Sequence, residues 1–378
     1  MRVAFIEGPL LEYRLPFLTA LQERVDRLQL FVAGLGFDLP ESQLRASGLD
    51  VSLLRSVSVN RRLRHPLGFR ELAQLDLPWN VCHVLSRFKP DVVISSEMGL
   101  RTVQAAAFRR RHPDCRLVLW ARLSEHSEAT RGAARKLLRK SLVHRADAII
   151  TNGSSGRRYL LGAGADPARV HVVHQASALD VRPPSQRPAR PLLRLLSVGR
   201  LVASKGLHLL LPALTAYPRE SWQLTVAGDG PESAWLRAFV SRRHLPVEFT
   251  GFVPRARLAD LFADHDVFVF PTLKDEWGLV AGEALRAGLP VLGSVYSDAV
   301  CEIVKDGATG WMMRPDRPQS IRVALDRAFA ATPGELQRAR ELARDSVRRL
   351  TPDVMAGQFL DVLHAACDTS PADRLAVR

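Results

Sequence analysis

The stretch from Asp275 to Ser294, DEWGLVAGEALRAGLPVLGS, constrains the fold of this chain more than any other part. A short apolar run, Val267 to Phe270, precedes it, and Leu289 to Leu292 has the pattern of a second buried strand. Between them the residues after Gly278 favour a helix, and Gly288 suits the left-handed position that ends one. Two parallel strands joined by a helix form a βαβ unit, whose loop lies where such sheets bind ligands. This region is therefore predicted to belong to a parallel α/β sheet.

Strand and helix patterns alternate along the rest of the chain as well. Apolar runs without strict period-two alternation suit strands that are covered on both faces. Such runs are Val3 to Ile6, Leu28 to Val32, Val51 to Leu54, Asp91 to Ser95, Leu117 to Trp120 and Ala148 to Thr151. The segment Arg182 to Pro191 has four prolines and no apolar periodicity. We expect two Rossmann-like α/β domains at residues 1–182 and 192–352, a linker at 183–191, and a C-terminal helix and tail at 353–378.

Two acidic residues mark the βαβ unit chemically, Asp275 in its loop and Glu283 eight positions later inside its helix. The spacing, with the strand that follows, resembles the donor-site signature of retaining glycosyltransferases of family 4. The resemblance implies that Asp275 contacts the donor sugar and that Glu283 contacts the ribose of the nucleotide. Family members usually have Glu at the first position, so Glu276 is an alternative holder of that role.

The donor diphosphate has two sets of candidate ligands. Backbone N–H groups of Gly278, Leu279 and Val280, at the start of the helix, suit a diphosphate. The sequence SVGRLVASKG, at residues 197–206, resembles the family segment whose Arg and Lys contact the same group. Arg200 and Lys205 take those roles here, and two cations match two phosphate charges.

Further matches follow in family order. Gly228 lies in LTVAGDGPE and Val253 in FTGFV, and both segments resemble sheet-edge loops, the second of which packs on the nucleobase through backbone groups. In the first domain the family keeps a histidine facing the donor sugar, and His126 is the candidate. The loop from Gly8 resembles the one that approaches donor phosphate and acceptor, but the acceptor pocket is not legible from it.

The resemblance also carries an architecture. It implies that the two Rossmann-like domains face each other across a cleft, and that the last helix, here Asp353 to Ala366, crosses back onto the first domain. A nucleotide-diphosphate sugar is then the donor substrate, with no other cofactor and no metal. The DxD-like triplet Asp264-His265-Asp266 precedes a strand, and Asp266 is interpreted as a structural residue at the strand start.

Charge is distributed unevenly. Residues 1–185 carry 28 Lys and Arg against 17 Asp and Glu, a net of +11, and the remainder carries 25 against 22, a net of +3, which together give +14. This excess suggests an anionic partner for the first domain. On a helix, Ala134, Leu137, Leu138, Ser141 and Leu142 fall along one stripe, and Arg135, Lys136, Arg139 and Lys140 cover the rest of the surface. That helix could lie on an anionic membrane surface, or pack its leucines on the core as an ordinary solvated helix.

Other classes fit less well. Aromatic residues make up 7% of the chain and no nucleic-acid-binding motif is present, so no nucleic-acid partner is expected. The cysteines are isolated and no apolar run approaches the roughly 20 residues of a membrane span, so a cytoplasmic protein, peripheral at most, is expected. The prediction is a metal-independent retaining glycosyltransferase that builds a surface glycan or glycolipid. The alternatives are a nucleotide-sugar epimerase on the same fold, transfer to a small soluble acceptor, or a binding module without turnover.

Overall fold

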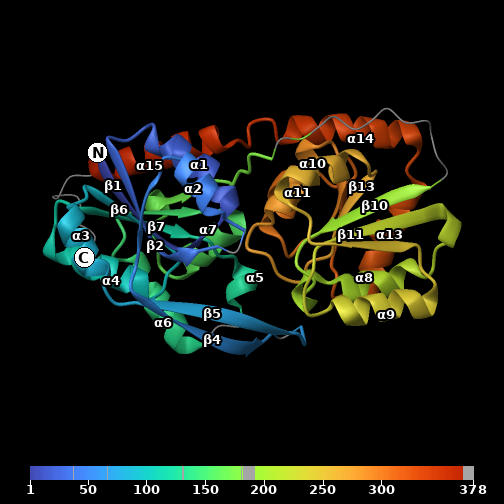
Figure 1. Cartoon of the computed structure of the whole chain (residues 1–378), viewed down its shortest axis with the longest axis horizontal. Helices are drawn as coiled ribbons and strands as arrows, with labels where there is room; N and C mark the ends of the chain where they lie inside the picture. Colours follow the sequence, from blue (N-terminus) through green and yellow to red (C-terminus); the bar gives the residue numbers. More distant parts are fainter. Residues whose placement is uncertain (37, 66, 130–131, 180, 182–191, 369–378) are drawn as a thin grey trace. The chain divides into compact units, whose positions relative to one another are not determined.

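The computed structural model describes residues 1–36, 38–65, 67–129, 132–179, 181 and 192–368. The chain divides into two compact units (Figure 1). The first comprises residues 1–61, 72–178 and 351 onward, and the second comprises residues 62–71 and 179–350. The predicted linker at 183–191 lies outside the described residues.

In its described part, the first unit contains a seven-stranded parallel sheet with the strand order β3-β2-β1-β6-β7-β8-β9. The strands are β1 (Arg2–Leu10), β2 (Arg27–Leu35), β3 (Asp50–Leu53), β6 (Val92–Ser96), β7 (Arg116–Ala121), β8 (Ala148–Thr151) and β9 (Val170–Val172). Each predicted strand is present, and β1 and β2 continue three to four residues beyond the apolar runs that predicted them. The order reverses between β1 and β6, which pair in parallel from Val3 opposite Val92 to Ile6 opposite Ser95. Strands β2 and β3 lie between them in the chain but on the other side of β1 in the sheet.

That reversal is the topological switch point of the sheet, because the chain leaves β1 toward β2 on one side and returns to form β6 on the other.

Helices cover both faces of this sheet. They are α1 (Leu15–Gln22), α2 (Glu41–Ala46), α3 (Val81–Phe88), α4 (Leu100–Arg111), α5 (Glu125–Glu128), α6 (Ala133–Val143), α7 (Ser154–Gly162) and α15 (Pro352–Asp368). On one face α1 and α15 lie side by side (Figure 1), and the Phe17, Trp120 and Phe359 rings pack together there. The opposite face packs on α3, α4, α6 and α7. The last helix therefore completes the core of the first unit, as the resemblance implied.

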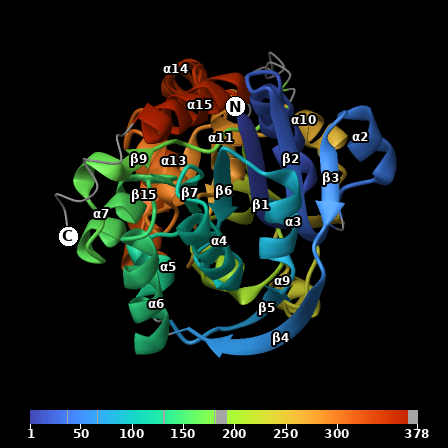
Figure 2. The ribbon, with the colours of Figure 1, turned by 90° about the vertical axis from the view of Figure 1, so that its left-hand side faces the viewer.

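Three described strands of the first half were not predicted: the short edge strand β9, and the pair β4 and β5. After β3 the chain forms β4 (Ser56–Arg64) and β5 (Arg70–Pro78), a two-stranded sheet of their own that Figure 2 shows as a long ribbon outside the main sheet. No strand was predicted here, because Arg61, Arg62 and Arg64 interrupt the apolar pattern that identifies a strand.

Helix α6 differs from the prediction in which face it buries. Leu137 is 70% exposed and Ala134 is also exposed, whereas Arg139 is only 4% exposed. The reason is Glu128, a buried carboxylate whose Oε1 accepts a hydrogen bond from Arg139 Nη2 at 2.9 Å. This pairing turns Arg139 toward the protein, so its predicted exposure is wrong. Of the predicted apolar stripe, Leu138 and Leu142 pack on the core, whereas Ala134 and Leu137 do not.

The second unit contains a six-stranded parallel sheet in its described part, with the order β12-β11-β10-β13-β14-β15. Its strands are β10 (Leu193–Val198), β11 (Trp222–Ala227), β12 (Val247–Gly251), β13 (Val267–Phe270), β14 (Val291–Ser294) and β15 (Gly310–Met313). Its helices are α8 (Leu207–Leu214), α9 (Ser233–Arg243), α10 (Arg255–Ala263), α11 (Leu279–Arg286), α12 (Asp298–Ile303), α13 (Pro318–Ala330) and α14 (Pro333–Ser346). One face packs on α8, α9 and α13, and the other on α10, α11, α12 and α14. Both units are thus Rossmann-like, which confirms the predicted fold class.

Local signals explain the βαβ unit at β13, α11 and β14. Gly278 precedes α11 with a φ of 94°, and Gly288 follows it with a φ of 82°, a backbone conformation that favours glycine. The strand after the helix begins at Val291, two residues later than predicted. Asp266, before β13, accepts hydrogen bonds from the Arg194 backbone N–H at 3.0 Å and from Arg340 at 2.6 Å, so it has the structural role that was predicted.

Candidate functional site

The candidate site of the second unit lies at the carboxyl ends of β10 and β13, where the strand order reverses. After β10 the chain passes through Arg200, which is exposed, to a 3-10 turn that ends at Lys205. Gly206 follows with a φ of 72°, and a Cβ added there would lie 1.9 Å from the carbonyl oxygen of Pro271. Glycine therefore lets the loops after β10 and β13 approach closely, and this approach brings Lys205 to the loop that carries Asp275.

Lys205 and Asp275 form an ion pair that the sequence did not predict. Lys205 Nζ donates to Asp275 Oδ2 at 2.5 Å, and the two side chains are 25% and 20% exposed. Asp275 Oδ1 accepts a further hydrogen bond from the Trp277 backbone N–H at 3.3 Å. Glu276, the alternative acid, is exposed, and Asp275 is the acid whose pairing with Lys205 is seen here.

The start of α11 provides backbone donors beside this pair. Gly278 is the N-cap, and Leu279 and Val280 form the first turn, whose N–H groups have no carbonyl partner within the helix. A Cβ on Gly278 would lie 2.6 Å from Ser297 Oγ, so only glycine fits this N-cap without displacement. The three residues predicted for the diphosphate therefore lie together at one helix N-terminus, the end that favours anions.

Glu283 lies further along α11 and is 5% exposed. Its Oε1 accepts a hydrogen bond from Arg255 Nη2 at 2.8 Å. Arg255 begins α10, and sequence reasoning missed it because a single arginine 28 positions earlier carries no recognisable pattern. The pair holds the carboxylate in place, since a buried charge is retained only when it is paired.

Gly228 and Val253 follow the next two strands of the sheet. A Cβ on Gly228 would lie 1.9 Å from the carbonyl oxygen of Gly199, and the Gly228 N–H donates to the carbonyl of Gly251 at 2.7 Å. The carboxyl ends of β10, β11 and β12 are therefore held together through backbone groups. Val253 lies two residues beyond β12 and is partly buried, beside the exposed ring of Phe252.

His126 belongs to the first unit, whereas the other predicted site residues belong to the second. The segment around it forms the single turn α5, which begins with a capping box between Ser124 and Ser127. Glu125 of the same turn pairs with Arg158 at 2.8 Å. His126 is partly exposed and follows β7, at the carboxyl edge of the first sheet.

A charged cluster that the sequence did not reveal lies at the same edge of the first unit. Glu7, at 2% exposure, accepts hydrogen bonds from Arg14 at 2.5 Å, Ser96 at 2.6 Å and Arg122 at 2.8 Å, and from the Gly8 N–H at 2.9 Å. These residues come from the ends of β1, β6 and β7 and from the turn before α1. They meet at the switch point of the sheet, and no short motif could have joined them.

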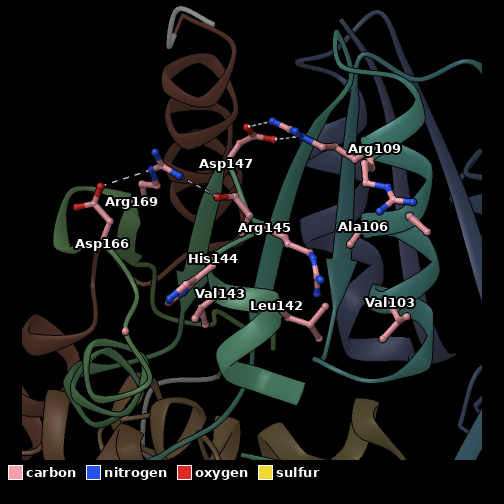
Figure 3. Close-up of a pocket in the computed structure, with 14 residues that line it drawn as sticks. Val103, Ala106, Arg109, Leu142, Val143, His144, Arg145, Asp147, Asp166 and Arg169 are labelled. Carbon is pink, nitrogen blue, oxygen red and sulfur yellow. Dashed lines mark hydrogen bonds and ion pairs between the residues drawn. The ribbon is translucent and has the colours of Figure 1, made fainter. Parts of the chain in front are cut away.

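A cavity of about 780 Å³ lies at the opposite, amino-terminal edge of the first sheet (Figure 3). It is lined mainly by α4, α6 and the segments that precede β8 and β9. Arg109 makes two hydrogen bonds to Asp147, at 2.8 and 3.2 Å, and Arg169 pairs with Asp166 at 3.5 Å. Arg145 extends from the end of α6 into the space beside α4 (Figure 3). None of the predicted site residues lines this cavity.

The two units define a class of proteins with paired Rossmann-like domains and a charged site at the carboxyl edge of each sheet. Comparison with known families identifies both halves. Residues 13–176 match the glycosyl transferase 4-like domain, and residues 185–345 match the glycosyl transferases group 1 domain. The chain therefore belongs to the two-domain glycosyltransferases that combine these domains.

Individual relatives agree with this assignment. An uncharacterised glycosyltransferase of Methanocaldococcus jannaschii is 34% identical over 140 residues, which are 36% of this chain and 35% of that protein. The D-inositol 3-phosphate glycosyltransferase of Mycobacterium bovis is 30% identical over 226 residues, which are 55% of this chain and 46% of that protein. The aligned regions thus span less than half the length of these curated relatives.

Solved structures share the whole architecture. The structure of HepE from Anabaena in complex with UDP has a TM-score of 0.77 and 17% sequence identity, and the match covers 97% of this chain and 100% of that one. At this identity the likeness establishes the fold alone.

Proposed function

We propose that this protein is a retaining glycosyltransferase that moves a sugar from a nucleotide-diphosphate sugar to an acceptor hydroxyl. The observation that carries the proposal is the convergence of Lys205, Asp275 and the N-terminus of α11 at the switch point of the second sheet. A cation, helix N–H groups and the nearby Arg200 suit a diphosphate, and the Asp275 carboxylate suits the hydroxyls of the attached sugar.

In the proposed reaction the bond between the anomeric carbon and the phosphate oxygen breaks while the acceptor oxygen bonds to the same carbon on the same face. The departing diphosphate takes the acceptor proton. Because the acceptor oxygen bonds directly to the anomeric carbon, no protein nucleophile takes part. Arg200, Lys205 and the α11 N–H groups stabilise the charge that develops on the leaving group. Glu283, held by Arg255, accepts hydrogen bonds from the ribose, Gly228 and Val253 border the nucleoside, and His126 contacts the donor sugar.

The proposal is tested by incubating the protein with UDP-, GDP- and ADP-sugars and measuring released nucleotide with and without acceptor sugars. Transfer predicts release that depends on both donor and acceptor. Conversion of the sugar without nucleotide release would indicate an epimerase, and binding without any turnover would indicate a binding module. A preceding screen for thermal stabilisation identifies the nucleotide, because a ligand of the native state raises the melting temperature.

We further propose that the acceptor is a lipid-linked saccharide of a surface glycan, which the protein meets at the cytoplasmic face of the membrane. No described helix is long and apolar enough to cross a bilayer. Support comes instead from the net charge of +11 in residues 1–185 and from the outer face of α6, where Lys136 and Lys140 flank the exposed Leu137. Basic residues near an anionic leaflet contribute about 1 kcal/mol each.

Sedimentation with anionic vesicles tests the membrane proposal. Replacing Lys136 and Lys140 with Gln should lower binding at about 0.1 M salt, and about 1 M salt should lower it in the wild type, because the Debye length shortens from about 10 to 3 Å. The matched control replaces Arg242 and Arg243, in the second unit, and should bind like the wild type. Wild-type protein that stays in solution with anionic lipid at low salt would contradict the proposal and favour a soluble acceptor.

A further inference from the structure

The charged cluster at the switch point of the first sheet lies where a ligand is expected. Glu7 and Gly8 belong to β1, Glu97 directly follows β6, and Arg122 directly follows β7. In open parallel sheets, ligands bind outside the carboxyl ends of the strands where the strand order reverses. In this sheet that point lies between β1 and β6.

In this cluster guanidinium groups outnumber carboxylates, and some N–H donors have no acceptor. Three guanidinium groups, those of Arg14, Arg101 and Arg122, meet two carboxylates, those of Glu7 and Glu97. Glu7 already accepts four hydrogen bonds. The Arg101 side chain is 6% exposed, and its Nη1 has no hydrogen-bond partner among the described residues, nor does the buried Nε of Arg122. A buried donor without a partner costs about 1–3 kcal/mol, so these N–H groups favour an added acceptor.

Glu97 holds the place of such an acceptor. Its φ of 67° is in the left-handed region, which costs a non-glycine residue of order 1–3 kcal/mol. The Thr102 hydroxyl fixes this backbone by donating to the Glu97 carbonyl at 2.6 Å. The Glu97 side chain is 54% exposed, pairs with Arg101 and lies 3.8 Å from Arg122. An exposed carboxylate on two guanidinium groups can be displaced by an anion from solution.

We propose that Arg101 and Arg122 bind a phosphate or carboxylate group of the acceptor substrate, and that this group displaces the Glu97 carboxylate. The proposal rests on the glycosyltransferase function proposed above. It narrows the acceptor class to saccharides or their carriers that have an anion near the hydroxyl that reacts. Guanidinium groups suit it because their planar N–H forks match the oxygens of phosphate and carboxylate.

The test saturates the protein with whichever of UDP, GDP and ADP stabilises it most, titrates it with inorganic phosphate at constant ionic strength, and follows the melting temperature. Arg101→Gln should raise the phosphate concentration for half-maximal stabilisation by about tenfold or more. Glu97→Gln should lower it about threefold or more, because the internal competitor is lost. The control Arg87→Gln, at an exposed arginine of α3, should match the wild type.

The opposite signs of the two variants separate binding from a structural role. If Arg101→Gln does not fold, the phosphate affinity of Glu97→Gln alone tests the inference. Unchanged or weaker phosphate binding in that variant would overturn it. Comparison of a hexose 6-phosphate, a hexuronate and a neutral hexose then distinguishes phosphate from carboxylate. A protein that binds one of these nucleotides but responds to phosphate identically in all variants refutes this inference alone, whereas failure to bind any of the three refutes the proposed function.

Discussion

The ion pair between Lys205 and Asp275 leads to a quantitative prediction about nucleotide affinity. If Lys205 binds the diphosphate, Lys205→Ala removes a charge-assisted interaction worth about 1.5–3 kcal/mol, which weakens binding of a nucleoside diphosphate by about 10- to 150-fold. Asp275 has the opposite effect, because its carboxylate competes for Lys205 and repels the phosphates. The pair is partly exposed, so its strength is about 1 kcal/mol, near the upper end for exposed pairs. Asp275→Asn should therefore bind the bare nucleotide up to about fivefold more tightly, while losing turnover of the sugar-bearing donor.

Isothermal calorimetry measures these affinities with whichever of UDP, GDP and ADP stabilises the protein most. The double variant should bind like Lys205→Ala, because removal of Asp275 helps only when Lys205 is present. Lys305→Ala, at an exposed lysine after α12, is the matched control and should leave the affinity unchanged. Wild-type affinity in Lys205→Ala, or an equal loss in Lys205→Ala and Asp275→Asn, would refute the assignment of these two residues.

Three further outcomes are expected. Glu283→Gln should weaken binding of the bare nucleotide about tenfold, whereas the exposed Glu276→Gln should not, and equal calorimetric affinities would argue against a ribose contact. Gly228→Ala should lower the free energy of unfolding, measured in urea, by about 2 kcal/mol or more, because its Cβ would lie 1.9 Å from a carbonyl oxygen. Gly34→Ala is the control, because a Cβ added there would meet no atom within 4 Å. Burial lowers the pKa of His265, so the unfolded chain binds the proton more readily than the folded protein. The neutral His265 therefore contributes stability above a pH of about 6.5, and this contribution is lost as the pH falls below that value. The free energy of unfolding of His265→Gln, measured in urea, should therefore decline less between pH 7 and 5 than that of the wild type.

Much of the fold could be predicted from local signals. The βαβ unit around α11 was legible because apolar runs, helix-forming residues and Gly278 and Gly288 follow one another within 28 residues, 267–294. The β4–β5 ribbon was missed because its arginines conceal the strand pattern. The predicted orientation of α6 was correct for Leu138 and Leu142 but wrong for Leu137 and Arg139. The burial of Arg139 depends on Glu128, a residue outside the helix whose burial the periodicity of the helix does not indicate.

The sequence named the residues of the candidate site but not the contacts between them. Loop glycines and the acid pair identified the carboxyl edge of the second sheet, and the structure places Arg200, Lys205 and Asp275 there. The partners of the charges were not visible, since Lys205 and Asp275 are 70 positions apart and Glu7 and Arg122 are 115 apart. Such pairs depend on how strands are ordered in the sheet, which a single sequence does not specify.

The return of α15 to the first unit has a consequence for synthesis on the ribosome. Phe359 lies against Phe17 and Trp120, so the apolar surface that they form stays open until residues near the end of the chain have emerged. The second unit, whose residues end at Leu350, is complete before that point. Folding is then expected to finish in the reverse of the usual N-terminal-first order, because Phe17 and Trp120 of the first unit are buried only after the second unit is complete.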